Sequence, residues 1–152
     1  MKHAVAMTAR GLMSIAITLS MGAAVMAAET TQFEPTFFDS LEPIEVYDPL
    51  AVALGALERD RPLVYRYEDA IKLAGHSCPA VSGGFKLTQL ALTDLYPDGR
   101  PLRGGITVRV RGDREHKVNG PLSAVVGLIT GAAPETGFSG LTGGMFSRKN
   151  LL

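Results

Sequence analysis

The feature that most constrains the fold of this chain is its apolar start. Lys2 and Arg10 open the chain, an apolar run covers residues 12–26, and small residues follow at Ala27 and Ala28. This combination is typical of a secretory signal peptide. A signal anchor is the alternative, but the run is shorter than the ~20 apolar residues that a membrane-spanning helix needs. We therefore expect cleavage after Ala27 or Ala28 and a periplasmic protein.

Removal of residues 1–28 leaves enough chain for one domain. Lys2 and Arg10 leave with this segment, so 13 basic residues face 15 acidic ones and the net charge is about −2. This balance argues against a nucleic-acid partner, and no later segment is long enough to span a membrane. Residues 29–98 carry mostly acidic charges and residues 99–152 mostly basic ones. The two halves are expected to meet, within one chain or across a dimer.

The sequence predicts a single α+β domain at residues 47–152. Before it, we expect an arm of irregular structure at 29–46 that packs through its phenylalanines. Helix signals begin at Asp48 and Pro49, where we expect a helix to about residue 58, and recur at 68–75, 79–95 and 122–130. Strands are predicted at 61–67 and, most clearly, at 106–111, where apolar and polar residues alternate. A closing strand at 146–152 is a further candidate. This order indicates a small mixed or antiparallel sheet packed with helices.

The single cysteine of the chain, Cys78, stands two residues after His76 and directly before Pro79, at the predicted helix start. A lone cysteine in an exported chain cannot form an internal disulfide. The N-terminus of a helix stabilises a thiolate, and His76 can turn its imidazole toward the same point. Nitrogen and sulfur donors suit zinc, copper or iron. The alternative is a buried, unreactive cysteine, which is the usual role of a lone one.

Other residues are candidates for the same site. His116, in a polar loop, is a possible third metal ligand, unless it is simply a solvated histidine. Gly83 and Gly84 in the first turns of the predicted helix indicate that something lies close to the helix backbone. Arg109 and Arg111 can hold an anionic group of a ligand, unless they form a solvated strand face. Because one chain cannot complete a four-ligand zinc site, a ligand, a water or a partner chain must supply the rest.

The segments YRYEDAIKLAGHSCPAVSGGFKLTQLAL, GGITVRVRG, NGPLSAVVGLITGA and GFSGLTGGMFSRKNLL resemble the FmdE-like family, which is named after one component of formylmethanofuran dehydrogenase. Its members carry a Gly-His-x-Cys-Pro element that enters a glycine-containing helix, and the similarity covers residues 48–152. The resemblance implies an α+β domain, often dimeric, with a metal, typically zinc, at His76 and Cys78. The neighbouring helix face is implied more weakly, and we include Tyr67 among the cofactor contacts. Gly144 stands where many members have a cysteine, so a second thiol ligand is missing.

These observations predict a periplasmic carrier, sensor or accessory protein, expected as a homodimer, that binds a metal ion or a small metal-containing ligand. Zinc is the first expectation, with haem or copper as alternatives. A small enzyme is the second hypothesis, with Cys78 or a metal-bound water acting on a small anionic substrate held by Arg109 or Arg111. A purely structural dimer module is the third. The family name is not carried over as an activity, because formylmethanofuran chemistry needs molybdenum or tungsten and cofactors for which this domain has no binding machinery.

Overall fold

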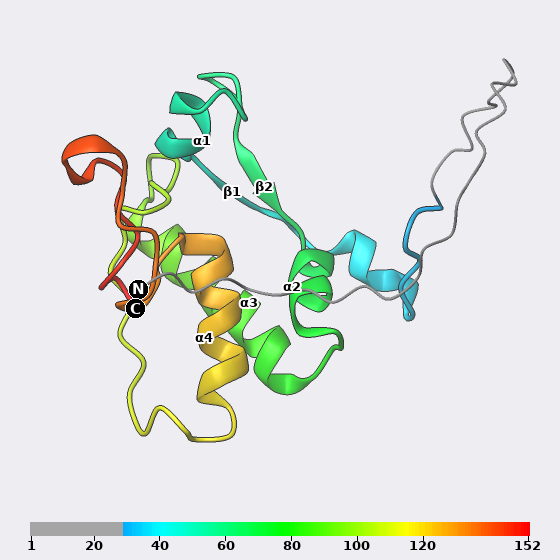
Figure 1. The fold of residues 1–152 in the computed structure, drawn as a ribbon. Coiled ribbons are helices and arrows are strands. Elements are labelled where there is room, and N and C mark those ends of the chain that lie inside the picture. Colours follow the sequence, from blue (N-terminus) through cyan, green and yellow to red (C-terminus); the bar gives the residue numbers. More distant parts are fainter. Residues whose placement is uncertain (1–28) are drawn as a thin grey trace, which may run out of the picture. The chain divides into compact units, whose positions relative to one another are not determined.

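The computed structural model describes residues 29–152, and the predicted signal peptide lies outside these residues. Helices and one small antiparallel sheet make up the part from Gln32 onward, which confirms the α+β class. No helix in the described part is both long and apolar enough to cross a membrane. The elements in chain order are the 3-10 helix η1 (Thr36–Ser40), β1 (Ile44–Val46), α1 (Pro49–Ala53), β2 (Leu63–Tyr65), α2 (Tyr67–Ala74), α3 (Pro79–Leu95), α4 (Asn119–Thr130) and the 3-10 helix η2 (Thr142–Gly144) (Figure 1).

The sheet consists of β1 and β2, which run between α1 and α2 (Figure 1). Ile44 is paired with Tyr65 and Val46 with Leu63. The prediction of irregular structure for the whole arm is therefore wrong for residues 44–46, and also for η1. A strand of three residues is too short to show a period in the sequence, and its pairing with β2 depends on a segment about twenty residues later.

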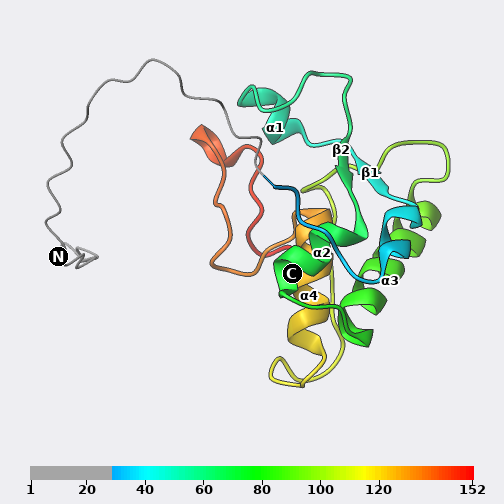
Figure 2. The ribbon, with the colours of Figure 1, turned by 90° about the vertical axis from the view of Figure 1, so that its right-hand side faces the viewer.

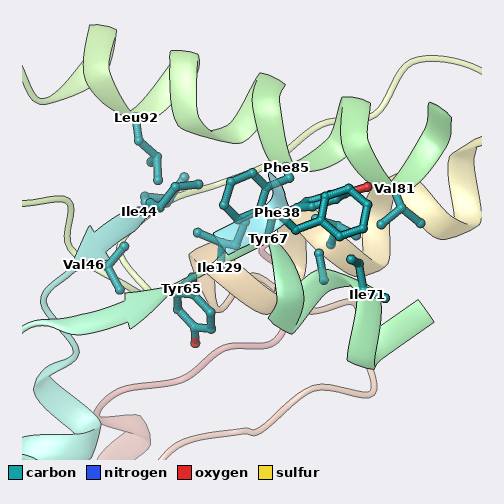
Figure 3. Packing of buried hydrophobic residues seen from close by; sticks show 13 residues of the cluster. Phe38, Ile44, Val46, Tyr65, Tyr67, Ile71, Val81, Phe85, Leu92 and Ile129 are labelled. Atoms are coloured by element: carbon teal, nitrogen blue, oxygen red, sulfur yellow. The ribbon is translucent and has the colours of Figure 1, made fainter. Parts of the chain in front are cut away.

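The arm packs as predicted only in part. Phe38 is buried and Phe33 packs against the core, whereas Phe37 remains 56% exposed. The rings of Phe38 and Tyr67 meet edge to face with centroids 5.1 Å apart, and Tyr67 meets Phe85 in the same way at 5.5 Å. This aromatic row connects η1 through α2 to α3, so the arm belongs to the core (Figure 3).

The core lies under α3, whose buried face carries Val81, Phe85 and Leu92 (Figure 3). α4 lies alongside α3, and α2 packs against both (Figures 1 and 2). At the closest approach, a Cβ on Gly84 would lie 3.3 Å from the carbonyl oxygen of Leu122. Gly83, in contrast, has open space where its Cβ would be. The close neighbour predicted from the two glycines is thus α4, and only Gly84 needs to be small.

Residues 106–111 do not form the predicted strand. The alternation itself is present, since Ile106 is buried, Val108 and Val110 are half-buried and Arg109 is exposed. Within residues 29–152, however, the backbone of this segment makes one hydrogen bond, from the Val108 N–H to the Leu151 carbonyl at 2.7 Å. Alternation of apolar and polar residues indicates which side chains are buried, but a β-strand also needs a neighbouring strand with which its backbone forms a ladder of hydrogen bonds. The candidate closing strand at 146–152 is irregular for a different reason: its backbone is hydrogen-bonded to Ala133, Pro134 and Phe138, but Phe146 and Asn150 adopt left-handed conformations with φ of 60°, which interrupt an extended strand.

Helix ends follow the local signals with two exceptions, the end of α1 and the start of α4. Asp48 caps α1 by accepting hydrogen bonds from the N–H groups of Leu50 and Ala51. α1 nevertheless ends at Ala53, earlier than predicted, where the chain turns through a left-handed Gly55. α2 ends at a left-handed glycine and α3 begins directly after a cysteine, as predicted, and α4 begins three residues earlier than expected.

Candidate functional site

The connection between α2 and α3 positions both His76 and Cys78. Gly75, with φ of 74°, ends α2 and reverses the chain direction. Cys78 then occupies the N-cap of α3 in an extended conformation, and Pro79 takes the first helical position. His76 is exposed and Cys78 is partly buried. The predicted helix start directly after Cys78 is thus confirmed.

The imidazole of His76 is oriented by the backbone of α2. Its Nδ1 lies 2.9 Å from the carbonyl oxygen of Ala74, so a neutral ring donates its Nδ1–H to that oxygen. This tautomer leaves the lone pair on Nε2, which is how protein backbones commonly orient metal-ligating histidines. The hydrogen bond to Ala74, together with the hydrogen bond and charge of Cys78, raises the pKa of His76.

The thiol of Cys78 lies in an environment that favours its ionised form. The backbone N–H of Val81 lowers the pKa of Cys78 most, partial burial opposes this, and the N–H of Ala80 and the imidazole of His76 lower it further. The side chain makes no capping hydrogen bond of ordinary geometry, so the N–H groups act through their electrostatic field. Each member of the pair therefore favours the charged form of the other, which makes Cys78 a better ligand or nucleophile than a free cysteine.

A pocket of about 420 Å³ lies beside the pair and was not predicted. Ser77, between the two site residues, turns its hydroxyl 2.7 Å from that of Tyr67 and lines the pocket. The volume falls within the range of small-molecule sites. Tyr67 thus lines a cavity next to the site, and its role as a cofactor contact stays a prediction. The other walls include Phe37, Phe38, Phe85 and Ser82.

The remaining predicted residues do not join this site. His116 lies in an exposed turn, and within residues 29–152 no three His, Cys, Asp or Glu side chains gather into a group that could hold a metal ion. His116 thus forms no group of three with His76 and Cys78 in the described part of the chain, and its role as a ligand stays a prediction. Arg109 and Arg111 are exposed and line no part of the pocket beside the pair. Gly83 and Gly84 also line no part of that pocket.

A second polar cluster, centred on Asp48, was not predicted from the sequence. The carboxylate of Asp48 accepts a hydrogen bond from Arg148 at 2.6 Å and another from Arg103 at 2.7 Å. Burial by itself raises the pKa of Asp48. The hydrogen bonds from Arg103 and from the Ala51 N–H, together with the positive charges of Arg148 and Arg103, outweigh the effect of burial. The pKa of Asp48 is therefore lowered. The cap at Asp48 was visible in the sequence, whereas Arg148 lies 100 residues away. The predicted contact between an acidic and a basic half occurs here, within one chain.

Similarity to known proteins gives no further guide to the site. No family model matches the chain, and no curated protein or solved structure matches it either.

Proposed function

We propose that this protein is an exported metal-binding protein that holds a transition metal ion, zinc first, through His76 and Cys78. One observation carries the proposal: an imidazole whose Nδ1 is held by a backbone carbonyl and a thiol with a lowered pKa interact at the start of α3. Nitrogen and thiolate donors match the ligand preference of zinc and also of copper. Such a protein would serve as a carrier, sensor or accessory factor, in line with the resemblance to the FmdE-like family.

The coordination has to be completed from outside one chain. Two donors are half of the four that a structural zinc site uses, and residues 29–152 hold no group of three candidate ligands. In a homodimer, a two-fold axis near His76 would bring together two imidazoles and two thiolates. This is the Cys2His2 set of many structural zinc sites. A metal-containing cofactor such as haem is the alternative, with its organic part in the aromatic pocket beside Ser77.

The test is metal analysis of the full chain purified without chelators, combined with its mass in solution. We expect roughly one zinc ion per two chains and a dimer that dissociates when the metal is removed. The His76→Ala, Cys78→Ala double variant should lose the metal, while the matched control His116→Ala should retain it. Equal metal content in the wild type and the double variant would refute the proposal, and a haem absorption band would identify the cofactor alternative.

A second candidate function is catalysis by Cys78 as a nucleophile. The lowered pKa of the thiol and the adjacent imidazole favour it, since these are the conditions that activate a cysteine. The predicted anion-holding residues Arg109 and Arg111 line no part of the neighbouring pocket, which leaves the substrate without an anchor. Alkylation of Cys78 separates the two candidates: zinc should protect a ligand thiol from the reagent, whereas a free nucleophile should react equally with and without zinc.

A further inference from the structure

We propose that Arg103 and Arg148 form a second binding site, for a small monocarboxylate. The positive and negative charges of this cluster do not balance. Asp48 and Arg148 are 3% and 5% exposed, and Arg103 is half-buried beside them. One carboxylate thus faces two guanidinium groups, which leaves one positive charge in excess. Buried charge is costly unless it is paired, so this cluster favours a monoanion.

Several hydrogen-bond donors of the two guanidinium groups have no acceptor in the described part of the chain. Arg148 gives Asp48 one bond from Nη2, and Arg103 gives one bond to Asp48 and another to the Leu128 carbonyl at 2.9 Å. The Nε of Arg103 and the Nε and Nη1 of Arg148 are buried and find no acceptor among residues 29–152. Buried donors without a partner are rare in folded proteins, because each loses its hydrogen bond to water on burial and gains none in return. An anion that approaches these groups would restore the lost hydrogen bonds.

There is also space beside the two arginines for a small ligand. A pocket of about 250 Å³ touches both Arg103 and Arg148. Gly104, with φ of 84°, leaves room for the Arg148 guanidinium, which a Cβ at that position would overlap. The pocket is smaller than the 300–1,000 Å³ typical of drug-sized ligands. Its remaining walls are mainly apolar, formed by Pro49, Leu102, Gly105 and Phe146.

These features together define the ligand class. Guanidinium groups bind carboxylates through charge-assisted hydrogen bonds, and the single excess charge favours a monoanion over sulfate or phosphate dianions. The apolar walls suit a short hydrocarbon chain. Acetate and propionate are the simplest probes with these properties. The site shares no residue with the His76–Cys78 pair, and so it does not depend on the proposed metal function.

The experiment measures anion binding to the full chain at neutral pH and constant ionic strength. Propionate and acetate should raise the thermal midpoint in a saturable manner and shift the Nε–H resonance of Arg148, while chloride and sulfate should do neither. Leu102→Trp, at a pocket wall that is 40% exposed, should fill the pocket and weaken propionate binding at least tenfold, with zinc content unchanged. Leu95→Trp, on the exposed side of α3, is the control and should bind like the wild type.

Two results would overturn the proposal. Equal effects of chloride and propionate at matched ionic strength would show general ion screening rather than a site. Unchanged propionate affinity in Leu102→Trp would place binding elsewhere. Because neither variant removes a charged group, both outcomes can be read in folded protein, and neither bears on metal binding at His76 and Cys78.

Discussion

Two of the polar clusters in the described part of the chain differ in burial. Asp48, Arg103 and Arg148 pair inside the fold, where one carboxylate and one guanidinium are almost inaccessible. His76 and Cys78 pair at the surface, at the start of α3. Removal of one partner from a buried pair leaves a charge that water cannot solvate, whereas an exposed pair is solvated either way. We therefore expect the first cluster to determine stability and the second to determine reactivity.

The largest effect is expected for Asp48→Asn. The change leaves Arg103 and Arg148 buried without a counter-charge, while asparagine can still cap α1, and the lost charge should cost about 3–5 kcal/mol in the free energy of unfolding. Urea denaturation measures it. Asp94→Asn, at an exposed position of α3, is the control and should change stability by less than about 0.5 kcal/mol. Similar losses in both variants would remove the distinction between buried and exposed charge.

The same cluster should make the protein sensitive to acid. The pKa of Asp48 is lowered from 3.8 in the folded protein, so its contribution to stability is fully present above the unfolded-state pKa. The contribution is lost as the pH falls through the folded-state value. Urea titrations from pH 6 downward should therefore show the wild type losing part of its advantage over Asp48→Asn below about pH 4. A constant difference between the two proteins across this range would contradict the assignment.

A smaller effect is expected within α3, the helix that carries Cys78 at its N-cap. Gly83→Ala should stabilise the protein by about 1 kcal/mol, because alanine favours helix and its Cβ meets no atom within 4 Å. The same change at Gly84 should fall short of this gain, since its Cβ would lie 3.3 Å from Leu122 and Val125 on α4. Denaturation of the two variants compares a half-buried position that has open space with a buried one that contacts α4. Equal gains in stability would mean that α4 can move away from the added methyl group without loss of packing energy.

The smallest change in stability is expected at the surface pair, where the change should instead be chemical. His76→Ala removes the imidazole that helps lower the pKa of Cys78, so the rate of thiol alkylation should rise at a higher pH than in the wild type. The metal-free protein is used, and its urea midpoint should stay within experimental error. His116→Ala is the matched control and should leave the profile unchanged. A profile that does not move in His76→Ala would show that the two side chains act independently.

Local signals in the sequence were sufficient for much of this structure. The helix at 79–95 was predicted with its first residue, because proline after an extended residue favours a helix start. The stop of α2 at Gly75 follows from the left-handed backbone that glycine tolerates. The juxtaposition of His76 and Cys78 was also predictable, since both belong to one short connection. The pocket lined by Ser77 and Phe38 was not, because its walls come from separate segments.

The sequence by itself therefore determined the long helix and the proximity of His76 and Cys78 before it, since both depend on residues a few positions apart, and its mixture of helix and strand signals was sufficient for the α+β class. Only the tertiary structure decided that Asp48 meets Arg148, that Gly84 meets α4, and that residues 106–111 lack a ladder. These outcomes depend on which distant segment is adjacent. Residue spacing carries no record of that choice, because burial and long-range pairing arise only when the whole chain packs.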